Sequence, residues 1–322
     1  MVSFVGIDVS STSLDVAVRP QGIKCSVSND PAGFEELESW LRGFSIKRIL
    51  LEATGGYERN ILHFLQDASY KVIRVNPKRA RSFADSMGIK AKTDAIDAEA
   101  LAHFAEVIPD KPTLQVSPDR ALLREFLQQR DRFVQQRDDD RRRLKQAQSQ
   151  VVVDLLKSHI QHLRLQIKLV EKEIKQQTTT LNDERIAQLI QVKGIGMVTA
   201  AKLVALLPEL GRVESREIAS LVGVAPFNHD SGKSVGKRYI SGGRSQVRRA
   251  LYMACWVAVR HNPGMKARYD ALRGRGKLAK VAIVACMRVF IVQLNAMIRT
   301  GTPWREQPPT KPESTAQAQG AA

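Results

Sequence analysis

The chain has 322 residues, of which 50 are Lys or Arg and 33 are Asp or Glu, so its formal net charge is +17 at pH 7. This length allows two domains with sizeable cores, and the charge favours a polyanionic partner, with nucleic acid as the default. A membrane-spanning protein is disfavoured, because no apolar run is expected to reach the ~20 residues of a spanning helix. The cysteines Cys25, Cys255 and Cys286 are scattered and odd in number, which predicts a reducing cytoplasm without a disulfide framework.

The positive charge is concentrated toward the C-terminus. Residues 1–115 carry 14 basic and 15 acidic side chains, residues 116–185 carry 15 and 11, and residues 186–300 carry 19 and 5. Together with the element patterns described below, this division predicts an α/β domain over 1–115, a helical region over 116–185, a basic domain over 186–300 and a disordered tail over 301–322.

The N-terminal stretch predicts a β-hairpin that carries a carboxylate. Residues 4–18 read FVGIDVSSTSLDVAV, two apolar runs joined by small turn-forming residues. Asp8 lies at the end of the first run, and a carboxylate inside an apolar strand is costly unless something neutralises it. One interpretation is a site for a hard cation such as Mg²⁺, which prefers oxygen ligands. The other is a solvent-facing acid on an edge strand.

Further acids follow at the ends of predicted elements. Residues 48–54 read RILLEAT, an apolar strand that ends in Glu52, and residues 92–98 read KTDAIDA at the start of a helical pattern. Asp94 and Asp97 are three residues apart and so share one helix face, although acids in a first helical turn also complement the helix dipole. Alternating strands and helices predict an α/β fold with a mixed sheet: strands at 23–27, 46–52 and 71–75, helices at 34–41 and 57–68.

Three motifs, GIDVS, LEATGGY and KTDAIDAEAL, resemble the DEDD motifs of bacterial insertion-sequence transposases related to the Piv DNA invertase, the bridge-RNA-guided recombinases. The resemblance implies an RNase H-like N-terminal domain similar to the junction resolvase RuvC. It implies that Asp8, Glu52, Asp94 and Asp97 are catalytic and bind Mg²⁺. It also implies target and donor DNA, a structured bridge RNA that selects them by base pairing, and a dimer or tetramer.

The middle of the chain is helical by pattern. Stepping by four and three from Leu123 predicts a heptad seam that runs to Leu155, and a second seam, shifted by one residue, runs from Leu163 to Ile174. We expect two helices with a break near Ser158, forming either a helical hairpin or a dimerising coiled coil. The basic stretch before the Asp pair, residues 78–92, is either a solvated loop and helix or a path for a nucleic-acid backbone.

The C-terminal domain is expected to be mainly α-helical. Residues 192–207 read VKGIGMVTAAKLVALL and resemble a helix-hairpin-helix motif, whose backbone N–H groups can hold a phosphate. The alternative is an ordinary helix start. A new helix is expected after Arg244, a basic turn at 268–280 and a closing helix at 281–297.

Residues 221–249, here called the serine segment, read LVGVAPFNHDSGKSVGKRYISGGRSQVRR. They are a second candidate catalytic region, because serine hydroxyls can act as covalent nucleophiles. The residues alone do not choose among Ser231, Ser234 and Ser241. In the family, the nucleophile belongs to a Ser-Gly pair that follows Gly-x-x-Pro, and this resemblance assigns Ser231. His229 is interpreted as an exposed loop residue rather than as a general base.

The favoured hypothesis is a transposase that cuts and rejoins DNA through a phosphoserine link, in a bacterial cytoplasm and associated with the nucleoid. The alternatives are a metal-only nuclease of the junction-resolvase type and a non-catalytic nucleic-acid scaffold. Residues expected to contact nucleic acid lie in the Gly-Ile-Gly turn and around the serine segment: Lys193, Gly194, Gly196, Lys233, Lys237, Arg238, Arg244, Arg248 and Arg249.

Overall fold

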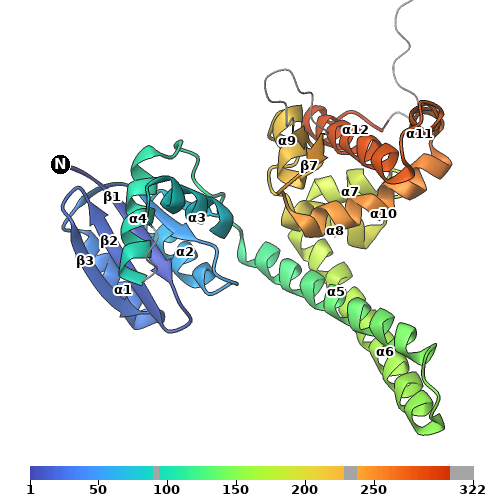
Figure 1. Cartoon of the computed structure of the whole chain (residues 1–322), viewed down its shortest axis with the longest axis horizontal. Helices are drawn as coiled ribbons and strands as arrows, with labels where there is room; N and C mark the ends of the chain where they lie inside the picture. The colour runs from blue at the N-terminus through green and yellow to red at the C-terminus, as the bar shows by residue number, and fades with distance from the viewer. Residues whose placement is uncertain (90–93, 228–237, 305–322) are drawn as a thin grey trace, which may run out of the picture. The chain divides into compact units, whose positions relative to one another are not determined.

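The computed structural model describes residues 1–89, 94–227 and 238–304, and the chain divides into two compact units, Met1–Gln115 and Val116–Ala322. The tail predicted to be disordered lies outside the described residues from residue 305 on. The hairpin strands and the helices of the two units are labelled in Figure 1.

The first unit is built on a five-stranded mixed sheet in the order β3-β2-β1-β4-β5. The strands β1, β2 and β3 are antiparallel neighbours, whereas β4 pairs in parallel with β1 and β5 in parallel with β4. Their bounds are β1 (Val2–Val9), β2 (Ser13–Arg19), β3 (Ile23–Ser28), β4 (Ser45–Glu52) and β5 (Val72–Val75). The predicted hairpin and mixed α/β fold are therefore confirmed.

Helices cover both faces of this sheet. The helices α1 (Pro31–Leu41) and α2 (Glu58–Asp67) pack on one face, where Ile49 and Leu51 of β4 are fully buried. The helices α3 (Pro77–Ser86) and α4 (Asp94–Val107) pack on the other face, against Leu50. A parallel strand buried on both faces reads as a continuous apolar run, as the Ile-Leu-Leu segment of β4 does.

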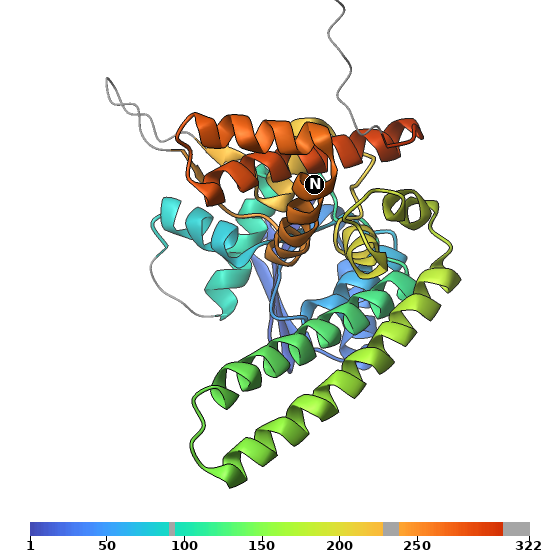
Figure 2. The ribbon, with the colours of Figure 1, turned by 90° about the vertical axis from the view of Figure 1, so that its right-hand side faces the viewer.

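The second unit contains a helical hairpin made of α5 (Pro118–Leu144) and α6 (Gln150–Leu181), which run side by side in opposite directions (Figures 1 and 2). The predicted break near Ser158 is wrong, since that residue lies inside α6 and the chain turns at residues 145–149. The apolar seam of α5 does not continue past this turn, so Val151 and Leu155 are 69% and 66% exposed. The second predicted seam, from Leu163 to Ile174, is confirmed, because Leu163, Ile167 and Ile174 are buried.

The rest of the second unit is a helical body around one apolar core. It comprises α7 (Glu184–Ile190), α8 (Met197–Leu206), α9 (Ser215–Val222), the short strands β6 (Pro226–Phe227) and β7 (Tyr239–Ile240), α10 (Ser245–His261), α11 (Pro263–Gly274) and α12 (Ala279–Thr300). Much of the stretch predicted as a basic turn at 268–280 is helical, because α11 extends to Gly274.

Within the described residues, α12 is the one helix long and apolar enough to cross a membrane, and the expectation that no apolar run reaches this length is wrong. Half of its apolar window is buried inside the protein. Phe290, Ile291 and Leu294 are fully buried in the core of the helical body, so the apolar composition of α12 is that of a central core helix.

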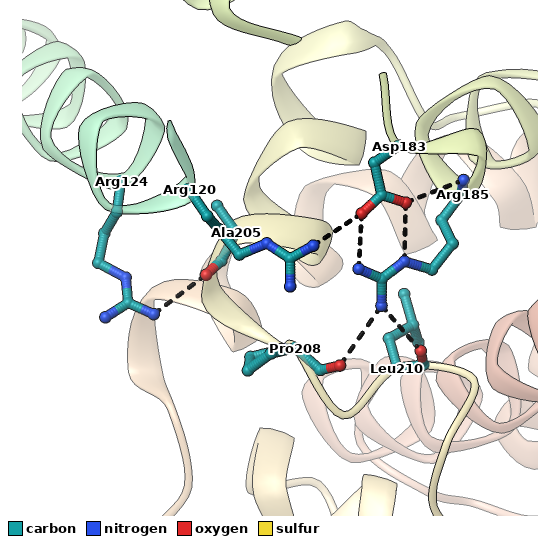
Figure 3. A network of polar contacts seen from close by, with 7 residues as sticks. All are labelled: Arg120, Arg124, Asp183, Arg185, Ala205, Pro208 and Leu210. Carbon is teal, nitrogen blue, oxygen red and sulfur yellow. Dashed lines mark hydrogen bonds and ion pairs between the residues drawn. The ribbon is translucent and has the colours of Figure 1, made fainter. Parts of the chain in front are cut away.

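A polar network attaches the hairpin to the helical body (Figure 3). Arg120 of α5 donates to Asp183 at 2.9 Å, and Asp183 also accepts two hydrogen bonds from the guanidinium of Arg185. Arg185 in turn donates to the carbonyl oxygens of Pro208 and Leu210. Burial raises the pKa of Asp183, but the hydrogen bonds and charge of Arg185 outweigh it and hold that pKa below its ordinary value.

Candidate active site

The carboxyl ends of β1 and β4 bring two acids to the same edge of the sheet. The two strands are parallel with Ile7 opposite Leu51, so the residues that follow, Asp8 and Glu52, lie on neighbouring strands at the same level. Both side chains are half-buried, as is Asp97 in the first turns of α4. Asp8, Glu52 and Asp97 line one cavity of about 590 Å³.

The position of Asp97 depends on how closely α4 approaches β1. A Cβ atom at Gly6 would overlap the backbone of Ala98 and Ala102, so only glycine lets α4 lie directly on the strand. At the other end of α4, the buried guanidinium of Arg48 donates to the carbonyl oxygens of Ile108 and Glu106. These carbonyls have no partner within a helix, so Arg48 fixes the C-terminal end of α4 on the sheet.

The turn after Glu52 is held by a buried acid that the sequence analysis missed. The Glu58 side chain is 4% exposed and pairs with Arg74 at 3.2 Å. Its carboxylate accepts hydrogen bonds from the backbone N–H groups of Thr54 (3.1 Å) and Gly56 (2.8 Å). Glu58 therefore positions the segment between Glu52 and α2, including Thr54, which lines the cavity. An acid shortly after Gly-Gly at a helix start was the signal available in the sequence.

The donor chemistry of the cavity suits a hard divalent cation, since carboxylate oxygens are the preferred ligands of such ions. Asp8 Oδ1 accepts a hydrogen bond from the Val9 N–H at 3.1 Å. In the described part of the chain, however, no group of three or more His, Cys, Asp or Glu residues is arranged to hold a metal ion. Asp94 is the first residue of α4, but its side chain lies outside the described part of the structure. The structure thus brings three of the four predicted acids to one cavity and does not describe the fourth side chain.

The predicted nucleophile Ser231 and the alternative Ser234 also lie outside the described residues, together with His229, Lys233 and Lys237. The other alternative, Ser241, is described and exposed. On either side of the undescribed stretch, β6 and β7 pair through Pro226 with Ile240 and Phe227 with Tyr239. These two short strands were not predicted from the sequence.

The glycines before β6 and after β7 pack closely against one another. A Cβ at Gly223 would overlap the Gly242 carbonyl oxygen, and a Cβ at Gly243 would overlap the Gly223 backbone. All three glycines have positive φ, at 77°, 65° and 69° for Gly223, Gly242 and Gly243. The chain before β6 and the chain after β7 therefore meet through backbone atoms.

Two of the predicted nucleic-acid ligands are engaged within the protein. Arg244 pairs with Glu209 through two contacts of 2.5 and 2.6 Å. Burial raises the pKa of Glu209, but Arg244 outweighs it and holds that pKa below its ordinary value. Arg248 donates to the carbonyl oxygens of Gly242 (2.7 Å) and Gly223 (3.3 Å), so its guanidinium joins the backbone before β6 to the backbone after β7.

The other described candidates lie at the surface or serve packing. Lys193, Gly196, Arg238 and Arg249 are exposed. Gly194 has φ +102°, and a Cβ there would press on the Ala254 carbonyl oxygen of α10 at 2.8 Å. Gly194 is thus needed to let the turn between α7 and α8 pack on α10, whatever that turn binds.

Comparisons with known proteins identify the class of this chain. Residues 5–153 match the profile of DEDD transposases of the IS110 type, and residues 186–270 match the transposase IS116/IS110/IS902 family. The pilin gene-inverting proteins of Moraxella lacunata and Moraxella bovis are each 29% identical over 316 residues, which cover 94% of this chain and 97% of each relative. An uncharacterized insertion element IS110 protein of Streptomyces coelicolor is 31% identical over 130 residues, 40% of this chain and 32% of that protein.

These matches make the chain a transposase, an enzyme that recombines DNA. The two profiles lie in the two parts of the sequence whose motifs carried the resemblance, and the resemblance is confirmed. The chain belongs to the IS110 transposase family. Its DEDD type is associated with divalent-metal use.

Proposed function

We propose that the protein is a bridge-RNA-guided transposase that cuts and rejoins target and donor DNA through a covalent phosphoserine. The observation that carries the catalytic half of this proposal is the cavity shared by Asp8, Glu52 and Asp97. Partly buried carboxylates repel one another, so bringing three of them to one cavity costs free energy. Such clusters are typical of functional sites, where a bound cation or a reaction makes use of the negative charge. This feature also argues against a non-catalytic scaffold.

The first unit is proposed to be an RNase H-like, RuvC-like domain. The order of its sheet supports this assignment, since three antiparallel strands are extended by two parallel strands and the acids lie at the ends of β1 and β4. Mg²⁺ is the proposed cofactor, held by Asp8, Glu52, Asp94 and Asp97. When bound, the ion would offset the negative charge that builds up on the phosphate oxygens.

Ser231 is proposed to attack the scissile phosphorus through its Oγ. The new Oγ–P bond forms as the P–O bond to one sugar breaks, and the serine proton leaves as the freed sugar oxygen gains one. Rejoining reverses these changes, with a sugar hydroxyl of the exchange partner as the attacking group, so no other source of bond energy is needed. The Arg248 contacts to Gly223 and Gly242 support this role, because they join the backbone on the two sides of the serine in sequence.

The bridge RNA and both DNAs are proposed to bind the basic second unit. Lys193 and Gly196 lie in the exposed turn between α7 and α8, an arrangement that supports a helix-hairpin-helix contact with a phosphate backbone. Arg238 and Arg249 of the serine segment are exposed, and the proposal includes Lys233 and Lys237 of the same segment. Binding to chromosomal DNA would place the protein in the cytoplasm with the nucleoid.

We also propose that two copies associate through the hairpin, with a tetramer on paired DNAs. An apolar stripe along α6 supports this, because Val151, Leu155, Leu165 and Leu169 are 69%, 66%, 52% and 58% exposed. These positions share one face of the helix. A second copy of the same stripe has the chemistry to cover it, as in a two-stranded coiled coil.

A metal-dependent nuclease of the junction-resolvase type is the second candidate, because the carboxylate cavity alone would suffice for it. The two mechanisms differ in one product. Incubation of the protein and its bridge RNA with end-labelled DNA carrying the element ends should give a protein–DNA band on a denaturing gel. Ser231→Ala should lose this band and strand cleavage while retaining RNA and DNA binding, and Ser234→Ala and Ser241→Ala should keep the band. Normal cleavage by Ser231→Ala would instead favour the nuclease.

A further inference from the structure

One wall of the carboxylate cavity is formed by α3. The residues Pro77, Ala80, Arg81 and Ala84 line it, and their spacing places them on one face of the helix. Ala80 and Ala84 are small and buried, which leaves the longer Arg81 as the prominent side chain of this wall. Among the described residues that line the cavity, Arg81 is the one cation, and three carboxylates share the cavity with it.

This distribution of charge matters because the proposed substrate is an anion. Each DNA phosphodiester carries one negative charge, and the carboxylates of Asp8, Glu52 and Asp97 repel it wherever a bound cation does not compensate them. A guanidinium on the cavity wall supplies a fixed positive charge and a planar set of N–H donors that matches phosphate oxygens. The remaining named lining residues are apolar, acidic or hydroxyl-bearing, so Arg81 is the side chain suited to this task.

The present contacts of Arg81 are compatible with such a role. Its Nε lies 3.0 Å from Asp85 Oδ1, one helical turn along α3, and the two side chains are 48% and 56% exposed. An exposed pair of this type contributes little to stability, because solvent screens the two charges. Exchanging Asp85 for a phosphate oxygen therefore costs the helix little.

We propose that Arg81 is a phosphate ligand of the active site, which binds a non-bridging oxygen of a DNA phosphodiester at the carboxylate cavity. This proposal rests on the proposed function, because it takes the cavity to be the place where DNA is cut. Asp85 holds the guanidinium on the cavity wall until DNA arrives, and the phosphate then replaces it.

The structural alternative is that Arg81 only stabilises α3 through its pair with Asp85. The two possibilities predict different results for the two partners. If the pair is merely structural, Arg81→Gln and Asp85→Asn remove the same interaction and have equal effects. If Arg81 binds phosphate, only Arg81→Gln loses activity, whereas Asp85→Asn releases the guanidinium and leaves DNA binding equal or tighter.

The test uses the full-length protein with its bridge RNA and labelled DNA carrying the element ends. We expect Arg81→Gln to slow cleavage at saturating DNA by roughly tenfold or more, and Arg81→Lys to recover part of the loss because it keeps the charge without the planar donors. Arg42→Gln is the matched control, since it removes an arginine from a comparable i,i+4 pair, with Glu38 at the end of α1, outside the cavity lining. It should cleave at the wild-type rate.

Equal cleavage rates for Arg81→Gln, Asp85→Asn and the wild type would overturn the phosphate role, and so would equal losses in the two variants. Melting temperatures of both variants, measured in parallel, show whether α3 remains folded. Asp8→Ala separates this proposal from the proposed function. If Asp8→Ala cleaves normally, the cavity is not the site of cutting. If Asp8→Ala is inactive and Arg81→Gln is not, only the assignment of Arg81 fails.

Discussion

Gly6 in the middle of β1 lies against the backbone of Ala102 in α4, with no room for a Cβ atom between them. This contact sets the distance between the strand that carries Asp8 and the helix that carries Asp97. The smallest residue in the GIDVS motif is therefore a structural requirement of the carboxylate cavity, two residues away from the acid itself.

Gly6→Ala should push α4 away from β1 and disturb the cavity. The neighbouring atoms belong to the helix backbone and cannot rotate aside, so we expect a loss of stability of about 1–3 kcal/mol or more, together with loss of cleavage. Thermal or urea unfolding measures the first effect and a cleavage assay the second. Gly43→Ala is the control within the same unit, because a Cβ there would make only an ordinary contact with the Trp40 carbonyl oxygen at 3.4 Å.

Removing the acids should abolish cleavage without unfolding the protein. Asp8→Ala or Asp94→Ala should lose strand cutting while RNA and DNA binding survive, because the basic residues belong mainly to the second unit. Calorimetric titration with Mg²⁺ should show weakened binding in the double variant Asp8→Ala/Glu52→Ala. A folded double variant that binds Mg²⁺ as the wild type does would show that these carboxylates are not the metal site.

The apolar stripe on α6 should control the oligomeric state. Leu155→Glu combined with Leu165→Glu places charges on a stripe that is already exposed, so the folded chain should keep its stability. We expect the variant to be monomeric by light scattering where the wild type is dimeric. The matched control is Lys157→Glu on the same helix, since residue 157 lies away from the stripe. Unchanged mass for the double variant would place the interface elsewhere.

The cysteines should be poorly reactive in the folded protein. Burial, with the charges of Glu36 and Asp15, raises the pKa of Cys25 to about 11 from the ordinary value of 9.0. Burial likewise raises the pKa of Cys255 and of Cys286. At pH 8 a disulfide reagent should therefore label them slowly, and the Cys25 rate should rise as the pH approaches 11. All three should react rapidly in denaturant.

The raised pKa of Cys25 also determines whether the protein gains or loses stability as the pH rises. The folded-state pKa of Cys25 lies above the ordinary one, so the contribution is fully present below about pH 9 and is lost as the pH rises through about 11. Unfolding measured from pH 8 to pH 11 should show wild type losing more stability than Cys25→Ala. A larger loss in Cys25→Ala would contradict this sign.

The sequence predicted the α/β unit well because local and tertiary preferences agree there. The runs around Asp8 and Glu52 are apolar, end at turn residues and pair as neighbours. The break near Ser158 was misplaced because the turn at residues 145–149 contains neither Gly nor Pro, and the N-cap residue Ser149 is the weak helix-start signal that it offers. The acid after Gly55-Gly56 marked Glu58 as a candidate for holding the helix start, but its buried pairing with Arg74 joins separate elements and could not be read from spacing.

Arg248 and Arg249 are adjacent in sequence, were expected to share one role, and are placed differently by the structure. Arg248 is half-buried and donates to carbonyl oxygens before β6 and after β7, whereas Arg249 is exposed. Arg248→Ala should therefore leave the carbonyls of Gly223 and Gly242 without this donor, lower the melting temperature, and reduce the yield of the covalent protein–DNA adduct. The loss of a hydrogen bond from a charged donor is typically about 1.5–3 kcal/mol.

Arg249→Ala should affect nucleic-acid binding rather than stability. It should leave the melting temperature unchanged and weaken nucleic-acid binding, with the slope of log K against log salt falling by about one phosphate contact. Melting curves and binding titrations at several salt concentrations, run on both variants, measure the two effects side by side. If Arg248→Ala weakens DNA binding with the same change in salt slope and no change in melting temperature, Arg248 is a direct nucleic-acid ligand, and the original prediction from the sequence stands.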